Sequence, residues 1–261
     1  MFCKDANSLG IVIFIHNLEF RGTFRLRNLL YSIRNQEDTV LNPNIIVVDQ
    51  SNDNSYRDIS KFCKEFNAEY VYSKLQGEFW CKGLCLNFGI KKLKNPFIAC
   101  MDVDNILAPN FFKTVQEEAS ESKLLICKVW KSSPKLDLTN FKMKDYIFLL
   151  SKCKYTEARC ANGACQLANR TWWYKIKGYN ENLLKWGTMD NELVAVAKLS
   201  GLIVQWINNK TSILHQYHDL GKDREQHLKN KEKYKQVLVT KTIKRNDNWG
   251  ELFVTKEERN G

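Results

Sequence analysis

The chain has 261 residues, of which 44% are hydrophobic, and this is enough to bury the core of one large α/β domain. Four prolines and twelve glycines, with no repeat and no stretch rich in Ser, Gly or Pro, exclude an evident linker or low-complexity segment. An excess of 40 Lys and Arg over 29 Asp and Glu gives a formal charge of +11, which favours phosphates, anionic lipid or nucleic acid as partners without distinguishing among them.

The first residues lack the basic and then apolar pattern of a signal peptide, and the first apolar run, 11–15, is too short to cross a bilayer. We therefore expect a cytoplasmic protein, with peripheral attachment to the inner membrane open as a further expectation. The nine cysteines follow no regular spacing and fit free thiols in a reducing compartment. The pairs Cys81/Cys85 and Cys160/Cys165 lack the CxxC spacing of zinc sites.

Short apolar runs alternate with segments of helical spacing through the first 105 residues. This pattern predicts an α/β fold with a parallel, doubly wound sheet. In such sheets ligands bind beyond the carboxyl ends of the strands, so Asp49, Asp102 and Asp104 should lie along one edge. The predicted strands are 11–15, 45–48, 69–72 and 97–101, and the predicted helices are 24–33, 56–66 and 81–93.

The pattern is less regular after residue 109. It predicts helices at 111–120 and 191–199, a strand at 124–129, a strand-like segment at 202–207 and a mixed region at 137–155.

The motif Asp102-Val-Asp104 follows a predicted buried strand. Alternate side chains of a strand point the same way, so these two carboxylates would offer oxygen ligands to one divalent cation, which could also bridge two phosphates. An ordinary acidic turn is the alternative, because DxD is a common pattern.

Two blocks of sequence resemble the β-1,4-galactosyltransferases and related family 2 glycosyltransferases. Residues 80–89 (WCKGLCLNFG), followed by 97–104, are similar to the segment that leads into the metal motif of these enzymes, with Lys82 and Asn87 at matching positions. The second block holds Asn162-Gly-Ala-Cys, then 172–181 and then KWGTMDNEL at 185–193. Order and spacing both hold, so the resemblance covers about residues 10–230.

The resemblance implies a GT-A fold, with a Rossmann-like nucleotide-binding half, a mostly parallel central sheet and an acceptor-binding half. We expect one domain, in which about 10–105 bind the nucleotide-sugar, about 106–230 form the acceptor and catalytic half, and 231–261 are a basic C-terminal extension. The basic residues of that extension are interleaved with acidic ones, as on an ordinary solvated helix.

The resemblance assigns Asp190 as the general base that removes the proton from the acceptor hydroxyl. Met189 and Thr188 stand where the galactosyltransferases carry a glutamate and a glycine, so the identity of their acceptor does not carry over. A helix N-cap is the other interpretation of Asp190.

The resemblance also implies a metal site made of Asp104, Asp102, His218 and His215, with Mn²⁺ or else Mg²⁺ as the cofactor. A pair of ordinary surface histidines is the alternative. For the nucleotide-sugar it implies Asp49 beside the uracil, a basic residue at Arg25 or Arg21, further contacts from Lys82, Asn87 and Asp102, and stacking by Trp186.

Together these features predict an inverting, metal-dependent glycosyltransferase of the hexosyltransferase type, which uses a UDP-sugar donor and a saccharide or glycoconjugate acceptor. A polysaccharide or a lipid-linked saccharide is the default acceptor. A nucleic-acid-modifying glycosyltransferase and a non-catalytic carbohydrate-binding protein of the same fold remain alternatives, and the basic surface leaves membrane or nucleic-acid contact open. A nucleotidyltransferase is disfavoured because residues 16–24 contain only one glycine, Gly22.

Overall fold

The computed structural model describes residues 5–17, 22–51, 55–73, 80–156, 162–185, 187–218 and 223–252. The strands are β1 (Leu9–Ile15), β2 (Asn44–Asp49), β3 (Glu69–Tyr72), β4 (Phe97–Asp102), β5 (Asn105–Leu107), β6 (Lys123–Ile126), β7 (Val129–Lys131), β8 (Lys154–Tyr155), β9 (Cys165–Asn169), β10 (Ile203–Trp206) and β11 (Ile213–His215). The helices are α1 (Phe24–Arg34), α2 (Tyr56–Glu65), α3 (Lys82–Lys92), α4 (Phe111–Glu118), α5 (Tyr146–Ser151), α6 (Arg170–Ile176), α7 (Met189–Leu199) and α8 (Arg224–Thr240), with a 3-10 turn at Met143–Asp145.

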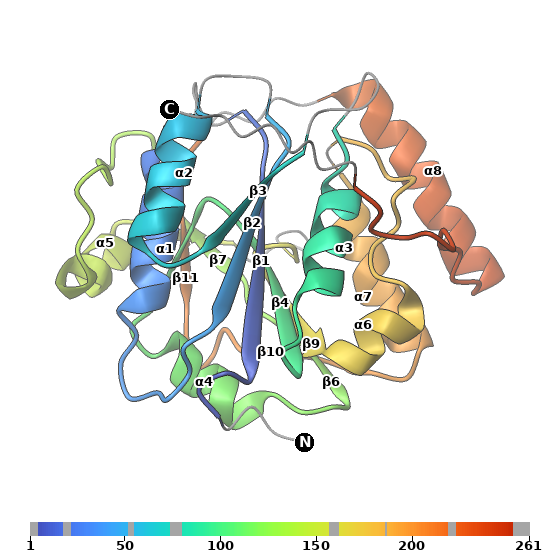
Figure 1. Ribbon diagram of the computed structural model, residues 1–261, viewed down its shortest axis with the longest axis horizontal. Coiled ribbons are helices and arrows are strands. Elements are labelled where there is room, and N and C mark those ends of the chain that lie inside the picture. The colour runs from blue at the N-terminus through green and yellow to red at the C-terminus, as the bar shows by residue number, and fades with distance from the viewer. Residues whose placement is uncertain are drawn as a thin grey trace.

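A seven-stranded sheet in the order β10-β6-β9-β4-β1-β2-β3 forms the centre of the molecule (Figure 1). All neighbouring pairs are parallel except those of β9, which runs antiparallel to both β4 and β6. The predicted α/β fold with a mostly parallel sheet is confirmed.

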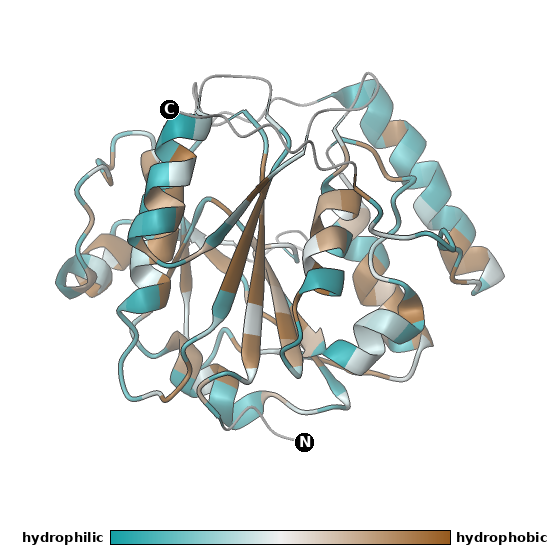
Figure 2. Cartoon of the chain, in the orientation of Figure 1, coloured by the Kyte–Doolittle hydropathy of each residue, from teal (hydrophilic) through white to brown (hydrophobic). Residues whose placement is uncertain are grey.

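The sheet is buried on both faces, and β1 shows how. Its residues Leu9, Ile11, Ile13 and Ile15 pack with apolar side chains of α1, α2 and α4. Val12 and its neighbour Phe14 pack instead with α3, α6 and α7 on the other face. Figure 2 shows the hydrophobic strands inside and hydrophilic outer faces on the helices. A strand covered on both sides needs an unbroken apolar run rather than alternation, which explains the sequence of β1.

A second, smaller sheet has the order β5-β11-β7-β8. In it His215 lies opposite Asn105 of β5 on one side and opposite Lys131 of β7 on the other. The prediction of one strand at 124–129 is wrong, because this region holds two strands: β6 pairs in the large sheet and β7 pairs in the small one. The chain changes sheets at residues 127 and 128, which a single apolar run does not reveal.

The end of the described chain is part of the domain. Helix α8 continues without a break across residue 231, where the sequence predicted a basic extension to begin. Trp249 is buried in the core of the α3, α6 and α7 face. Arg245 forms an ion pair with Glu192 of α7, with both nitrogen–oxygen distances at 2.9 Å and both side chains almost fully buried.

The described cysteines are free thiols, as expected, and all but the half-buried Cys153 are buried. Burial raises the pKa of Cys63 to about 12 and of Cys81 to about 11, so these thiols stay protonated. Cys3 and Cys160 lie outside the described residues. In the described part of the chain, no helix has the length and apolar character needed to span a bilayer.

We predict that Arg245→Met lowers the free energy of unfolding by about 3–5 kcal/mol, because it leaves the buried Glu192 carboxylate without its partner. Urea denaturation measures this loss. The double variant Arg245→Met/Glu192→Met removes both charges and should recover most of the stability. A single variant as stable as the parent would contradict a structural role for the pair.

Candidate functional site

The acidic residues predicted to share one edge of the sheet do so. Asp49 ends β2 and Asp102 ends β4, and the two strands flank β1 with Ile15 opposite Asp49 and Phe14 opposite Asp102. This edge is also where α3 begins, with Lys82 as its first residue.

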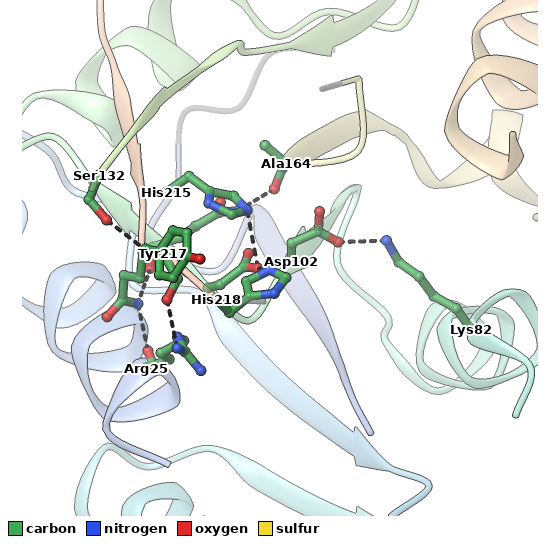
Figure 3. Close-up of polar contacts among 11 residues, drawn as sticks. Arg25, Lys82, Asp102, Ser132, Ala164, His215, Tyr217 and His218 are labelled. Atoms are coloured by element: carbon green, nitrogen blue, oxygen red, sulfur yellow. Dashed lines mark hydrogen bonds and ion pairs between the residues drawn. The ribbon is translucent and has the colours of Figure 1, made fainter. Parts of the chain in front are cut away.

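Asp104, His215 and His218 form a compact group whose ligand atoms all lie within 4.8 Å of one another. Nε2 of His215 is 3.2 Å and Nε2 of His218 is 2.6 Å from the same carboxylate oxygen, Oδ2 of Asp104. The antiparallel pairing of β5 with β11 brings these segments together, and the backbone N–H of Gln216 donates to the carbonyl of Asp104 at 2.8 Å. Figure 3 shows the two imidazoles side by side.

The electrostatics of this group suit a cation. Burial alone would raise the pKa of Asp104, but the charges and hydrogen bonds of His215 and His218 hold it well below its ordinary value of 3.8. Its second oxygen, Oδ1, is buried and has no hydrogen-bond partner in the described part of the chain. A carboxylate with an unpaired oxygen and two imidazole nitrogens is a donor set that fits a divalent transition metal.

The structure separates the two aspartates of the DxD motif. Asp102 is the last residue of β4, whereas Asp104 lies in the turn that follows, so strand alternation no longer orients it. The Asp102 carboxylate pairs with Nζ of Lys82 at 2.5 Å (Figure 3). Of the pair, only Asp104 belongs to the group that could hold a metal.

Lys82 lies between two carboxylates, because its Nζ is also 3.9 Å from Oδ1 of Asp190. Burial raises the pKa of Asp102, Lys82 lowers it, and the nearby charges of Asp104 and Asp190 raise it again, with the result at about 6. Burial would lower the pKa of Lys82, but the same carboxylates raise it above its ordinary value, so this lysine is charged.

Asp190 is the second residue of α7, whose N-cap is Thr188, so the interpretation of Asp190 as the N-cap is wrong. Its side chain is 35% exposed. Oδ1 is buried and has no hydrogen-bond partner in the residues that the structure describes. A carboxylate with this exposure, one oxygen unpaired and a cation nearby, can accept a proton from a bound molecule.

Gly163 fixes the place of the Asp190 carboxylate. A Cβ atom at position 163 would lie 2.5 Å from Cγ of Asp190, closer than any real contact, so only glycine leaves room for it. Gln166 of β9 supports the first turn of α7, because its Nε2 donates to the Asp190 carbonyl at 3.3 Å. Gly163 stands in the Asn162-Gly-Ala-Cys block, so a sequence signal for it existed, whereas Gln166 has none.

The residues predicted to contact the nucleotide are spread out. Asp49 is fully buried and accepts hydrogen bonds from the Tyr70 hydroxyl at 2.8 Å and from the Ser51 N–H at 2.9 Å. Arg25 lies elsewhere, beside the histidines, and donates to the carbonyl of Tyr217 at 2.6 Å (Figure 3).

The predicted contact from Asn87 does not agree with its surroundings. Its fully buried amide accepts from the N–H of Tyr179 and donates to the Tyr179 carbonyl and to Glu181. Asn87 therefore joins α3 to the segment after α6 and has no exposed atom for a ligand. Two residues on, Gly89 lets α3 approach β1, where a Cβ would lie 2.4 Å from Val12.

Trp186 and Arg21 lie outside the described residues. Trp80 stacks on rings of the chain itself, with ring centroids 5.6 Å from Phe14 and 5.2 Å from His16.

Comparison with known proteins gives two family matches. Residues 11–177 match the model for Glycosyl transferase family 2, and residues 147–219 match the model for the N-terminal domain of galactosyltransferase. No curated protein sequence matches the chain significantly.

Solved structures share the fold. The crystal structure of GalNAc-T7 with UDP, GalNAc and Mn²⁺ is 15% identical with a TM-score of 0.66, over 89% of this chain and 48% of that one. S. aureus TarS is 14% identical with a TM-score of 0.58, over 89% and 40%. TarS 1-349 in complex with UDP-GlcNAc is 14% identical with a TM-score of 0.55, over 82% and 59%.

The chain thus spans between 40% and 59% of the lengths of these proteins. The shared architecture is the GT-A fold. Because the first family match extends over more than half of its residues, the chain belongs to glycosyl transferase family 2.

Proposed function

We propose that this chain is an inverting, metal-dependent glycosyltransferase that moves a sugar from a UDP-sugar to a hydroxyl of a saccharide or glycoconjugate. The observation that carries the proposal is the arrangement at one sheet edge. There Lys82 connects Asp190 to Asp102, and Asp104, two residues after Asp102, lies with His215 and His218 in a group that could hold a metal. The solved relatives with UDP, UDP-GlcNAc and Mn²⁺ support the donor class and the metal.

Asp104, His215 and His218 would hold the metal. Two imidazoles with one carboxylate favour Mn²⁺ over Mg²⁺, which prefers oxygen ligands. When bound, the metal would supply positive charge to the diphosphate that leaves the sugar.

Asp190 would act as the general base. As the acceptor oxygen attacks the anomeric carbon, its proton passes to the Asp190 carboxylate while the bond from that carbon to the diphosphate oxygen breaks. Attack from the face opposite the leaving group inverts the configuration, and no covalent sugar intermediate forms. Lys82, whose Nζ is 3.9 Å from Oδ1 of Asp190, and the first turn of α7 would hold this carboxylate in place beside the acceptor.

Trp186 remains our proposal for contact with a sugar ring, and Asp49 at the end of β2 for contact with the base of the nucleotide. Because the Asp49 carboxylate is fully buried, the base would have to displace the Tyr70 hydroxyl from it. Arg25 would act indirectly. By donating to the carbonyl of Tyr217, it fixes the residue that lies between His215 and His218 in the chain.

We predict that Asp190→Asn lowers sugar transfer by about 100- to 10,000-fold, because the amide cannot take the acceptor proton. Binding of UDP with Mn²⁺ should be retained. Release of UDP from UDP-sugars in the presence of saccharide acceptors measures transfer, and thermal shift measures binding. Turnover at the parent rate would exclude Asp190 as the base.

We predict that Mn²⁺ affinity falls as the pH is lowered from about 8 to about 6. Burial lowers the pKa of His215, but Asp104 raises it more, so the net pKa is above the ordinary 6.5. The metal needs the neutral imidazole, so affinity is highest above this raised pKa and is lost as the pH falls through it. Titration calorimetry with MnCl₂ measures the change.

The variant His215→Gln should bind Mn²⁺ at least about 100-fold more weakly at the higher pH and should lose much of the pH dependence. His227→Gln is the matched control, because that histidine lies on α8 outside the group, and it should bind like the parent. Equal affinity in the two variants would contradict the metal site.

We predict that Gly163→Ala lowers transfer by about 100-fold, because the new methyl group displaces the Asp190 carboxylate by close to an ångström. The free energy of unfolding should change by less than about 1 kcal/mol, since only a short side chain has to move. Urea denaturation measures the free energy of unfolding, and UDP release measures sugar transfer, so the two effects are separated. Full activity would show that the position of Asp190 is not critical.

A further inference from the structure

Two consecutive residues of α5 have large, exposed apolar side chains. Ile147 is 70% exposed and Phe148 is 64% exposed. Helix α5 lies at one end of the long axis of the molecule, at the left of Figure 1. Single exposed apolar residues are ordinary on protein surfaces, but an adjacent pair at a protruding end needs an explanation.

The base of this helix is fixed. Tyr146 is fully buried, and its hydroxyl lies 3.0 Å from Oγ of Ser212. Leu138 and Phe141, just before the helix, pack in a separate small core with Ile106 and Leu214. Ile147 and Phe148 are therefore held outward by a packed base.

The charge around this apolar pair is strongly positive. Residues 131–154 contain six lysines and two aspartates, with no arginine or glutamate. Exposed lysines stand on both sides of α5, Lys142 and Lys144 before it and Lys152 and Lys154 after it. Nζ of Lys152 is 5.3 Å from the centroid of the Phe148 ring, so the charge adjoins the apolar surface.

The basic surface extends toward the candidate site. In the small sheet His215 lies opposite Lys131, and Lys131 lies opposite Lys154. Residues paired in this way project from the same face of a sheet, so a row of cations leads from the metal group to the segment after α5.

Helix α8, at the other end of the long axis, lacks this combination (Figure 1). Its Lys229 pairs with Glu225 and its Lys235 with Glu232. Its exposed Leu228 lies between the partners of the first ion pair in the sequence, whereas Leu238 and Val239 form an adjacent exposed pair beyond both ion pairs. Part of the positive charge of α8 is thus neutralised by its own glutamates, whereas none of the four lysines beside α5 forms an ion pair with a described residue.

We propose that α5 and its flanking lysines dock the protein on an anionic lipid bilayer, with Ile147 and Phe148 entering the headgroup region. Neither signal suffices alone, since stable binding at a membrane surface takes an apolar insertion together with a basic patch. Docking would bring the row from Lys154 to His215 close to the membrane. The docking itself does not depend on the proposed function. Only the further claim that the acceptor is lipid-linked rests on that function.

A second copy of this chain fits the surface poorly. A stable dimer buries about 1,200 Å² or more, far beyond two side chains, and pairing this face with itself would bring the lysine-rich rims together. The lysines have the opposite effect on an anionic bilayer, because they add attraction.

Vesicle co-sedimentation tests the proposal. The parent should bind vesicles of phosphatidylcholine with phosphatidylglycerol and should not bind phosphatidylcholine alone. Ile147→Asp/Phe148→Asp and Lys144→Glu/Lys152→Glu should each weaken binding at least about tenfold. Val239→Asp is the matched control, because this residue is 81% exposed on α8, and it should bind like the parent.

Absence of parent binding to the anionic vesicles would overturn the proposal, as would full binding by Ile147→Asp/Phe148→Asp. A parent dimer in solution that the same variant dissociates would show an interface between copies instead. Thermal shift with UDP and Mn²⁺ in the absence of vesicles keeps the two proposals apart. Both surface variants should respond like the parent, and a parent without this response contradicts the donor assignment while leaving the docking result intact.

Discussion

Three carboxylates lie close together at one edge of the large sheet, and the cationic and imidazole groups beside them hold this edge together. Asp102 and Asp190 share Lys82, and Asp104 is held by His215 and His218. Without such partners, buried like charges would repel and would take up protons. The partners come from α3, from β11 and from the segment that follows β11, so the edge can form only when distant parts of the chain have assembled.

The same principle extends into the second half of the chain. Glu192 of α7 is buried in the core and is neutralised by Arg245, while Glu181 accepts hydrogen bonds from Asn87 and from the backbone of Gly250. These two buried or half-buried carboxylates fasten the end of the described chain to the segments on either side of Asp190. The charged residues in this region therefore stabilise the fold, in addition to any part they have in the proposed reaction.

Local pattern predicted the sheet edge well, because β1, β2 and β4 are continuous apolar runs and each acidic turn follows one directly. It predicted less where geometry depends on pairing. Asp102 and Asp104 differ in surroundings because the strand ends between them, and His215 meets Asp104 only through the pairing of β11 with β5. Helix α8 looked like an extension because its lysines outnumber its few buried residues, Gln226, Asn230 and Val237.

The two sheets are joined at three places, because the chain leaves the large sheet and enters the small one directly from β4 to β5, from β6 to β7 and from β10 to β11. Three short crossings along one seam leave the small sheet little freedom to slide or tilt. Asp104 lies within the first crossing, and His215 ends the strand that follows the third. The spacing of the ligand atoms is thus set by the topology of the chain, and a metal bound there would find its coordination geometry ready, with little loss of conformational entropy on binding.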